Sequence, residues 1–159
     1  MSLDQLNSKP GHLIRRAQQI AVAVFMEECA QFDLTPVQYA ALAAIHLQPG
    51  IDATRLSQLI ALDRSTTGSV LERLEAKELV LRSASPEDRR IKLLRLSAAG
   101  LALLEEVEAA VERAQLRIVA PLAPAQRKTF MRLLAQLVES NNALSRAPAC
   151  LDSLDARAA

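Results

Sequence analysis

Apolar residues recur every three or four positions over most of this chain, which is the period of an α-helix. The spacing predicts six helices, over residues 12–32, 36–48, 53–60, 64–78, 98–120 and 124–144. Thr35, Asp52 and Asp63 each stand where a helix N-cap is needed, and Pro36 follows the first of them at the position that tolerates proline best. We therefore expect a helical protein with two short helices joined by a tight turn at its centre.

One stretch departs from the helical period. Residues 79–82 and 91–96 are rich in β-favouring side chains and flank a polar segment that contains Pro86. This pattern predicts a β-hairpin with a mobile tip. The fold class is therefore mainly α with a small β-hairpin. Two short helices followed by a hairpin are typical of a winged helix-turn-helix, in which one helix enters the major groove of DNA and the hairpin, or wing, reaches the neighbouring backbone.

The charge of the chain is concentrated in the wing. The whole sequence of 159 residues has a net charge of only +1, half of its residues are hydrophobic and 3% are aromatic. Residues 79–96 nevertheless contain five basic side chains against two acidic ones. Such a local excess favours DNA contact over a solvated loop, because the helix-turn-helix stands directly before it.

Other classes of protein find little support. The N-terminus resembles no export signal and no apolar run approaches the length of a membrane span, so we expect a cytoplasmic protein with no membrane partner. Cys29 and Cys150 form no metal-ligand or CxxC spacing, so neither a metal nor another cofactor is expected. Cys29 is expected to pack as a small apolar group, and redox switching is the less favoured alternative. No nucleophile elbow, phosphate-binding glycine loop or HExxH occurs, so the chain is not expected to be an enzyme.

Five short strings carry a resemblance to a known family. They are Leu34-Thr35-x-x-Gln38-Tyr39-x-x-Leu42, Asp63-Arg64-Ser65-Thr66, Leu74-Glu75-x-Lys77, Asp88-Arg89-Arg90 and Leu96-Ser97-x-x-Gly100. In this order and spacing the chain resembles the multiple-antibiotic-resistance regulator (MarR) family of winged-helix transcription factors over nearly its whole length. The resemblance implies a symmetric dimer, recognition helices in successive major grooves, wings in the minor groove, and frequent release from DNA by a small aromatic acid.

The resemblance also implies a division of the chain. Residues 1–146 form one domain and 147–159 a flexible tail. Within the domain, residues 34–97 are the DNA-binding winged helix-turn-helix, and residues 10–32 and 98–146 are dimerisation helices. The last two helices have more apolar surface than a short winged domain can cover, which independently favours a dimer.

DNA contacts are expected from two places. The resemblance assigns the recognition helix to residues 63–79 and the wing tip to Asp88, Arg89 and Arg90, with Arg90 as the side chain that inserts and Asp88 bracing the loop. The candidate DNA-binding residues are Arg64, Ser65, Thr66, Ser69, Arg73, Asp88, Arg89, Arg90 and Lys92.

The chain departs from the family pattern twice. Ser69 stands where many members have a basic residue, and Glu78 replaces the glycine that usually ends the recognition helix. Gly68 lies inside that helix, where glycine costs about 1 kcal/mol relative to alanine. Either close approach to DNA or a packing constraint accounts for its presence.

A ligand site is a further hypothesis. His12 and Arg16 lie one turn apart, as Tyr39 and His46 lie two turns apart, and together they can hold a carboxylate and a ring nitrogen or hydroxyl. The alternative is that His46 is a half-buried, satisfied histidine and Arg16 an interhelical ion-pair partner. The chain is also similar to the branch of the family that controls breakdown of aromatic or pyridine carboxylic acids such as nicotinate.

The favoured function is thus a ligand-responsive homodimeric repressor. It would bind palindromic double-stranded DNA with half-sites about 10 base pairs apart and be released by a small aromatic carboxylate. The alternative is a helical protein–protein adaptor or dimerisation module that does not bind DNA, because such domains share the same hydrophobic pattern.

Overall fold

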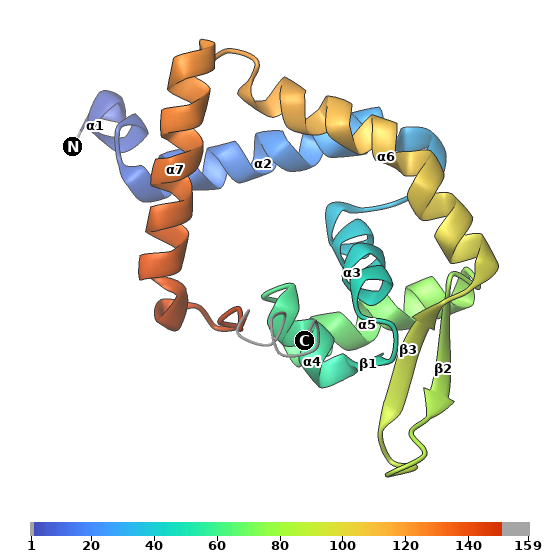
Figure 1. The fold of residues 1–159 in the computed structure, drawn as a ribbon. Coiled ribbons are helices and arrows are strands. Elements are labelled where there is room, and N and C mark those ends of the chain that lie inside the picture. Colours follow the sequence, from blue (N-terminus) through green and yellow to red (C-terminus); the bar gives the residue numbers. More distant parts are fainter. Residues whose placement is uncertain (1, 151–159) are drawn as a thin grey trace.

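The computed structural model describes residues 2–150, which are largely helical with one small antiparallel sheet (Figure 1). The elements in chain order are α1 (Leu3–Asn7), α2 (Pro10–Glu28), η1 (Ala30–Phe32), α3 (Pro36–Leu47), β1 (Ile51–Asp52), α4 (Ala53–Leu59), α5 (Arg64–Ala76), β2 (Val80–Ala84), β3 (Lys92–Leu96), α6 (Ala98–Val119), α7 (Pro124–Ser140) and η2 (Asn142–Leu144). The predicted fold class, mainly α with a small hairpin, is confirmed.

The expected N-caps begin the helices as predicted. Thr35 and Gln38 exchange reciprocal hydrogen bonds at the start of α3, at 3.2 and 3.0 Å. The Asp52 carboxylate accepts hydrogen bonds from two backbone N–H groups of α4. Ser97 accepts one from the N–H of Gly100 at the start of α6, at 3.0 Å. These contacts satisfy N–H groups that the helices themselves leave unpaired, so the helix boundaries are set locally.

Three features differ from the expectations. The first long helix ends at Glu28 rather than residue 32, and the chain continues through η1 to Asp33, which adopts a left-handed φ of 49°. The short helix α1 and the strand β1 were not predicted, because five and two residues are too few to show a period. The expected tail begins with a hydrogen-bonded segment up to residue 150, and 151–159 lie outside the described residues.

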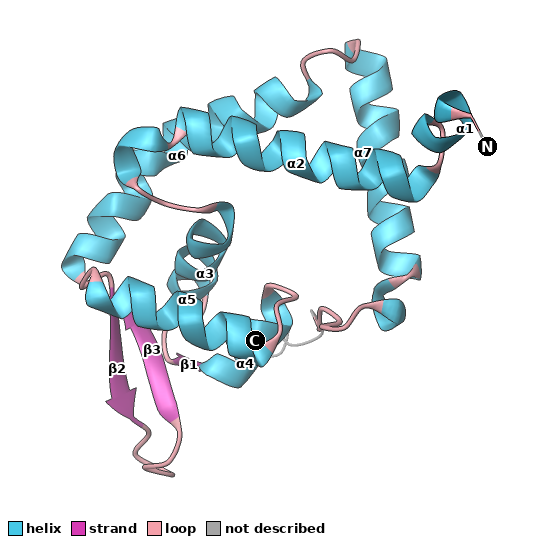
Figure 2. Ribbon diagram, turned by 180° about the vertical axis from the view of Figure 1, so that it is seen from behind, coloured by secondary structure: helices cyan, strands magenta, loops and turns pink. Residues whose placement is uncertain are grey.

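The sheet has the order β1-β3-β2, and both pairs of strands are antiparallel. Leu94 on the central strand lies opposite both Ile51 and Arg82, and its side chain is fully buried. β1 thus closes one edge of the hairpin against the helix-turn-helix, which fixes the direction in which the wing extends (Figure 2).

The core lies where α3, α5, α6 and the sheet meet. Its fully buried side chains include Leu42, Ile45, Leu71 and Leu94, and Phe25 and Cys29 add the end of α2. Cys29 is 1% exposed, as expected of a small apolar group.

Beside this core, α2 packs along α6. Arg113 and Arg117 of α6 form ion pairs with Glu28 at 3.1 and 2.7 Å. They hold the pKa of Glu28 below its ordinary value, mainly through the hydrogen bond from Arg117.

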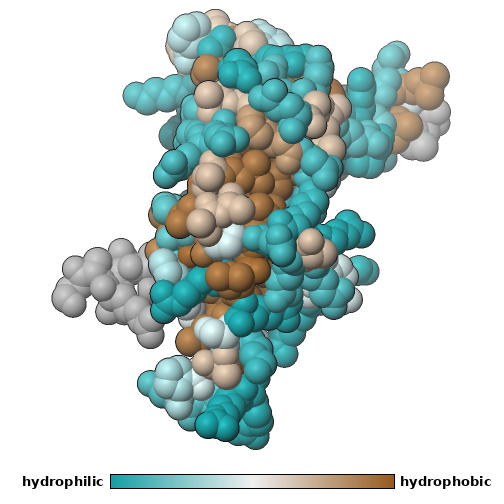
Figure 3. Space-filling model, turned by 90° about the vertical axis from the view of Figure 1, so that its right-hand side faces the viewer, coloured by the Kyte–Doolittle hydropathy of each residue, from teal (hydrophilic) through white to brown (hydrophobic). Residues whose placement is uncertain are grey.

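Helix α7 is different from the other long helices, because none of its side chains is buried against the rest of the described chain. Its apolar side chains, Phe130, Met131, Leu133, Leu134, Leu137 and Val138, are all exposed. Apolar surface also appears on the side of the molecule where α6 meets β2 and β3, with polar surface on either side of it (Figure 3). Within residues 2–150, no helix has the length and apolar character needed to cross a membrane.

Candidate nucleic-acid interface

The start of α5 is organised by Asp63. Its carboxylate accepts a hydrogen bond from the backbone N–H of Thr66 at 2.9 Å and another from the Thr66 hydroxyl at 2.6 Å. These bonds, led by the one from the hydroxyl, hold the pKa of Asp63 below its usual range. Asp63 is therefore an ionised cap. Because the proton of the Thr66 hydroxyl is used, that oxygen can only accept a hydrogen bond from a base or another donor.

The predicted recognition residues lie on the outer side of α5. Thr67, Val70, Leu71 and Leu74 are buried and fix the helix against the core. The side chains predicted to approach DNA are all exposed: Arg64, Ser65, Thr66, Ser69 and Arg73. Ser65, Thr66, Ser69 and Arg73 therefore share one exposed, mostly small and polar face of α5, as insertion into a major groove requires, whereas Arg64 is exposed at the start of the helix, outside that face.

The end of α5 explains the Leu74-Glu75-x-Lys77 string in structural terms. Lys77 donates to the Asp33 carboxylate at 2.6 Å, and Arg82 pairs with Glu75 at 2.8 Å. The first contact joins α5 to the turn before α3, and the second joins it to β2. Both charged residues of the string thus position the helix within the fold.

The turn after α5 adopts the conformation that glycine usually provides. Glu78 has a φ of 57°, in the left-handed region, and its carbonyl accepts a hydrogen bond from the Ser97 hydroxyl at 2.6 Å. Gly100 lies against this turn, and a Cβ there would overlap the carbonyl oxygen of Leu79. The Leu96-Ser97-x-x-Gly100 string therefore lets α6 start directly against the end of the recognition helix.

The wing tip is held by Asp88. Its carboxylate accepts hydrogen bonds from the backbone N–H of Arg90 at 2.9 Å and from the Arg90 guanidinium at 3.0 Å. These hydrogen bonds lower the pKa of Asp88, and the one from the Arg90 side chain has the larger effect. The Arg90 side chain is 91% exposed despite the pair. This is the geometry that a bracing aspartate and an extended arginine need.

The wing is less positive than its composition indicates. The Arg82 side chain is 33% exposed and forms an ion pair with Glu75, a contact that the sequence did not predict because the partners lie on different elements. Arg89 and Lys92 remain exposed beside Arg90 at the hairpin end. Of the four basic side chains of the wing other than Arg82, three thus lie at its tip, and Arg95 is exposed on β3.

The four predicted ligand residues are not gathered within one chain. The Tyr39 ring lies 6.0 Å from that of Phe25. His12 lies about 20 Å before Phe25 along α2, at 1.5 Å per residue. His46 is exposed at the end of α3, so its description as half-buried is wrong. Burial raises the pKa of Tyr39, with nearby Glu108 and Glu112 acting in the same direction.

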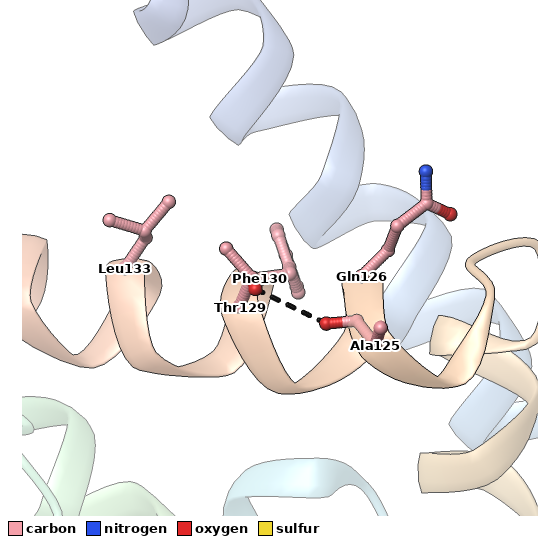
Figure 4. Close-up of a pocket in the computed structure, with 5 residues that line it drawn as sticks. All are labelled: Ala125, Gln126, Thr129, Phe130 and Leu133. Carbon is pink, nitrogen blue, oxygen red and sulfur yellow. Dashed lines mark hydrogen bonds between the residues drawn. The ribbon is translucent and has the colours of Figure 1, made fainter.

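A shallow hollow lies elsewhere, on α7 (Figure 4). It has a volume of about 410 Å³ and is lined by Ala125, Gln126, Thr129, Phe130 and Leu133. The Thr129 hydroxyl donates to the Ala125 carbonyl at 3.2 Å. None of these five side chains carries a charge that could hold a carboxylate. Within residues 2–150, no group of three His, Cys, Asp or Glu side chains is placed to hold a metal ion.

Comparison with known proteins identifies the architecture. A model of the MarR family matches residues 34–92. The HTH-type transcriptional repressor NicR of Pseudomonas putida is 30% identical over 131 residues, which cover 82% of this chain and 83% of NicR. The chain belongs to the MarR family.

Two solved MarR-type structures extend the comparison. BpsR of Bordetella bronchiseptica, whose DNA binding is regulated by 6-hydroxynicotinic acid, is 34% identical with a TM-score of 0.78, covering 82% of this chain and 94% of BpsR. The repressor CouR bound to a 23-mer DNA duplex is 27% identical with a TM-score of 0.80, covering 87% of this chain and 98% of CouR. The predicted winged helix-turn-helix fold and the family are thereby confirmed.

Proposed function

We propose that this MarR-family protein is a homodimeric repressor that binds a palindromic DNA operator through α5 and the wing. The observation that carries the proposal is the pairing of an uncovered polar surface on α5 with a basic wing tip braced by Asp88. The existence of a DNA-bound relative of the same fold supports it. Small polar side chains on α5 would read base edges, while Arg89, Arg90 and Lys92 would contribute charge.

Arg90 is expected to change partners on binding. Its ion pair with Asp88 is exposed to solvent, and exposed pairs of this kind are weak. Arg90 can therefore exchange the carboxylate for DNA without unfolding the wing, because the backbone bond from Arg90 to Asp88 remains.

Selection from random sequence tests DNA binding and finds the operator in the same step. Duplexes of about 30 base pairs are selected from a random pool, a length that holds two half-sites one helical turn apart. Affinity for the selected duplex is then measured over a range of salt concentrations. Arg90→Ala should weaken binding and reduce the steepness of its salt dependence by about one unit if Arg90 contacts a phosphate.

The matched control is Arg132→Ala. Arg132 lies on α7, two positions from Phe130 and on the opposite side of the helix from it, so the same charge is removed far from the wing. It should leave binding close to that of the wild type. The alternative, a protein–protein adaptor that does not bind DNA, would be favoured by three results together. The selection would yield no preferred sequence, the affinity for duplex would not depend on salt, and Arg90→Ala would have no effect.

We further propose that a small aromatic or pyridine carboxylate releases the protein from DNA. The regulation of BpsR by 6-hydroxynicotinic acid supports this class of effector. His12 and Arg16 supply groups that can hold a carboxylate, but they lie far from Tyr39 and His46 in one chain. A site containing all four would have to form between two copies.

The effector can be found by measuring thermal unfolding with a series of nicotinate- and benzoate-type acids. A ligand that binds the native dimer must raise the unfolding midpoint. Arg16→Ala should abolish that rise, whereas Arg15→Ala on the same exposed stretch of α2 should not. The absence of a shift across the whole series would rule out this class of effector.

A further inference from the structure

The chain returns to the helix-turn-helix after α7. We call residues 146–150 the C-terminal segment. Asn142 holds it in a bent path, because its side-chain amide donates to the Ala149 carbonyl and accepts from the Ala149 N–H, both at 2.8 Å. The N–H of Cys150 then donates to the carbonyl of Gln58 on α4, at 3.1 Å. The last described residues therefore lie against the turn that leads into α5 (Figure 1).

A pocket of about 440 Å³ lies between the C-terminal segment and the helix-turn-helix, and residues of both line it. Its lining residues are Ser57, Gln58, Leu62, Asp63, Arg64, Arg146, Ala147, Pro148, Ala149 and Cys150. Two arginines therefore line the same hollow, one at the first position of the recognition helix and one on the C-terminal segment. Among residues 2–150, neither guanidinium has a carboxylate within 4.0 Å.

The charge of this pocket is complementary to an anion. Among the described residues that line it, Asp63 is the single acidic one, and both of its carboxylate oxygens already accept hydrogen bonds from Thr66. The two arginines leave an excess of one positive charge. Guanidinium groups are well suited to phosphate oxygens, since their N–H groups form a planar fork.

The pocket also adjoins the proposed DNA-binding surface. It lies at the start of α5, whereas the wing follows the other end of that helix (Figure 1). DNA seated on α5 would therefore pass the wing at one end and the two arginines at the other.

We propose that Arg64 and Arg146 together bind one phosphate of the DNA backbone, so that the C-terminal segment is part of the DNA interface. This inference rests on the proposed function. The contact positions α5 in the groove and reads no base, so it acts on every duplex alike.

The test measures affinity against salt concentration for the wild type, Arg146→Ala and Arg132→Ala, on the selected duplex and on an unrelated one. Arg146→Ala should weaken binding several-fold on both duplexes and reduce the salt slope by about one unit. Arg146→Lys should restore part of the affinity, since it keeps the charge. Arg132→Ala removes the same charge from the solvent side of α7 and should leave the slope unchanged.

A second variant tests whether the bent path of the C-terminal segment is needed in addition to the Arg146 side chain. Asn142→Ala removes both bonds to Ala149 and should lower affinity and slope as Arg146→Ala does, although Arg146 is still present. Unfolding midpoints establish that each variant is folded.

The proposal is overturned if Arg146→Ala keeps the wild-type slope, or if Arg132→Ala lowers it equally, while the wild type binds duplex with a steep salt dependence. If the wild type shows no such binding, the proposed function fails and this inference fails with it.

Discussion

Glu78 shows how a single backbone conformation links the recognition helix to the wing. Its N–H donates to the Glu75 carbonyl at 2.8 Å and its own carbonyl accepts from Ser97, so the turn is fixed on both sides. The φ of 57° costs a residue with a Cβ roughly 1–2 kcal/mol, whereas glycine adopts it freely. Because Glu78 is exposed, its side chain is not needed for packing.

Glu78→Gly should therefore stabilise the fold. We expect the free energy of unfolding to rise by about 1 kcal/mol, which corresponds to an increase of about 2–4 °C in the melting temperature for a chain of this size. Thermal unfolding at a fixed protein concentration measures it. Glu106→Gly, on an exposed position inside α6, is the matched control and should lower stability by about 1 kcal/mol. If both variants lose stability, the strain assigned to Glu78 is wrong.

At the scale of elements, α5 carries a glycine that the fold does not require. A Cβ added at Gly68 would have no atom of the described residues within 4 Å beyond its chain neighbours and its own helix backbone, so packing within this part of the chain does not require glycine. Close approach of the helix backbone to DNA is therefore the interpretation of Gly68 that is left to test.

Gly68→Ala should have opposite effects on stability and binding. Helix propensity alone should raise the free energy of unfolding by about 1 kcal/mol, while the new methyl group should weaken binding to the selected duplex. Thermal unfolding and duplex titration measure the two effects. Gly11→Ala, in a helix where a Cβ also meets nothing, should leave DNA affinity unchanged. Wild-type affinity in Gly68→Ala would contradict the close approach.

The elements that could be predicted from sequence are those with local signals. Asp63 precedes a run of apolar residues with helical spacing and so predicts the start of α5. Pro86 lies between two runs of β-favouring residues and so predicts the turn of the hairpin. β1 could not be predicted, because two residues become a strand only through pairing with β3. The ion pair between Arg82 and Glu75 was equally hidden, since it depends on how α5 and β2 pack. The ligand residues failed to converge for the same reason: periodicity places side chains on a face but does not place one helix against another.

At the scale of the whole molecule, the uncovered apolar face of α7 indicates a partner. An apolar surface of this kind is unfavourable in water and is commonly covered by association. Phe130, Leu134 and Leu137 lie on one side of the helix, at spacings of four and three residues, while Arg132 lies on the other. We expect a second copy of the chain to cover this face about a twofold axis, which is the commonest arrangement of homodimers.

Leu137→Glu should disrupt that dimer, because it places a charge within the apolar face, where Leu137 is 47% exposed in the single chain. Sedimentation at micromolar concentration should show a monomer, whereas Arg132→Glu on the opposite side should remain dimeric. Two linked recognition helices bind a palindrome far more tightly than one, since the second contact becomes intramolecular. The monomeric variant should therefore lose affinity for the palindrome yet bind a single half-site much as the wild type does. If monomeric Leu137→Glu bound the palindrome as tightly as the wild type, the proposal that the protein binds DNA as a symmetric dimer would be wrong. That result would not bear on the roles proposed for Arg90 and α5.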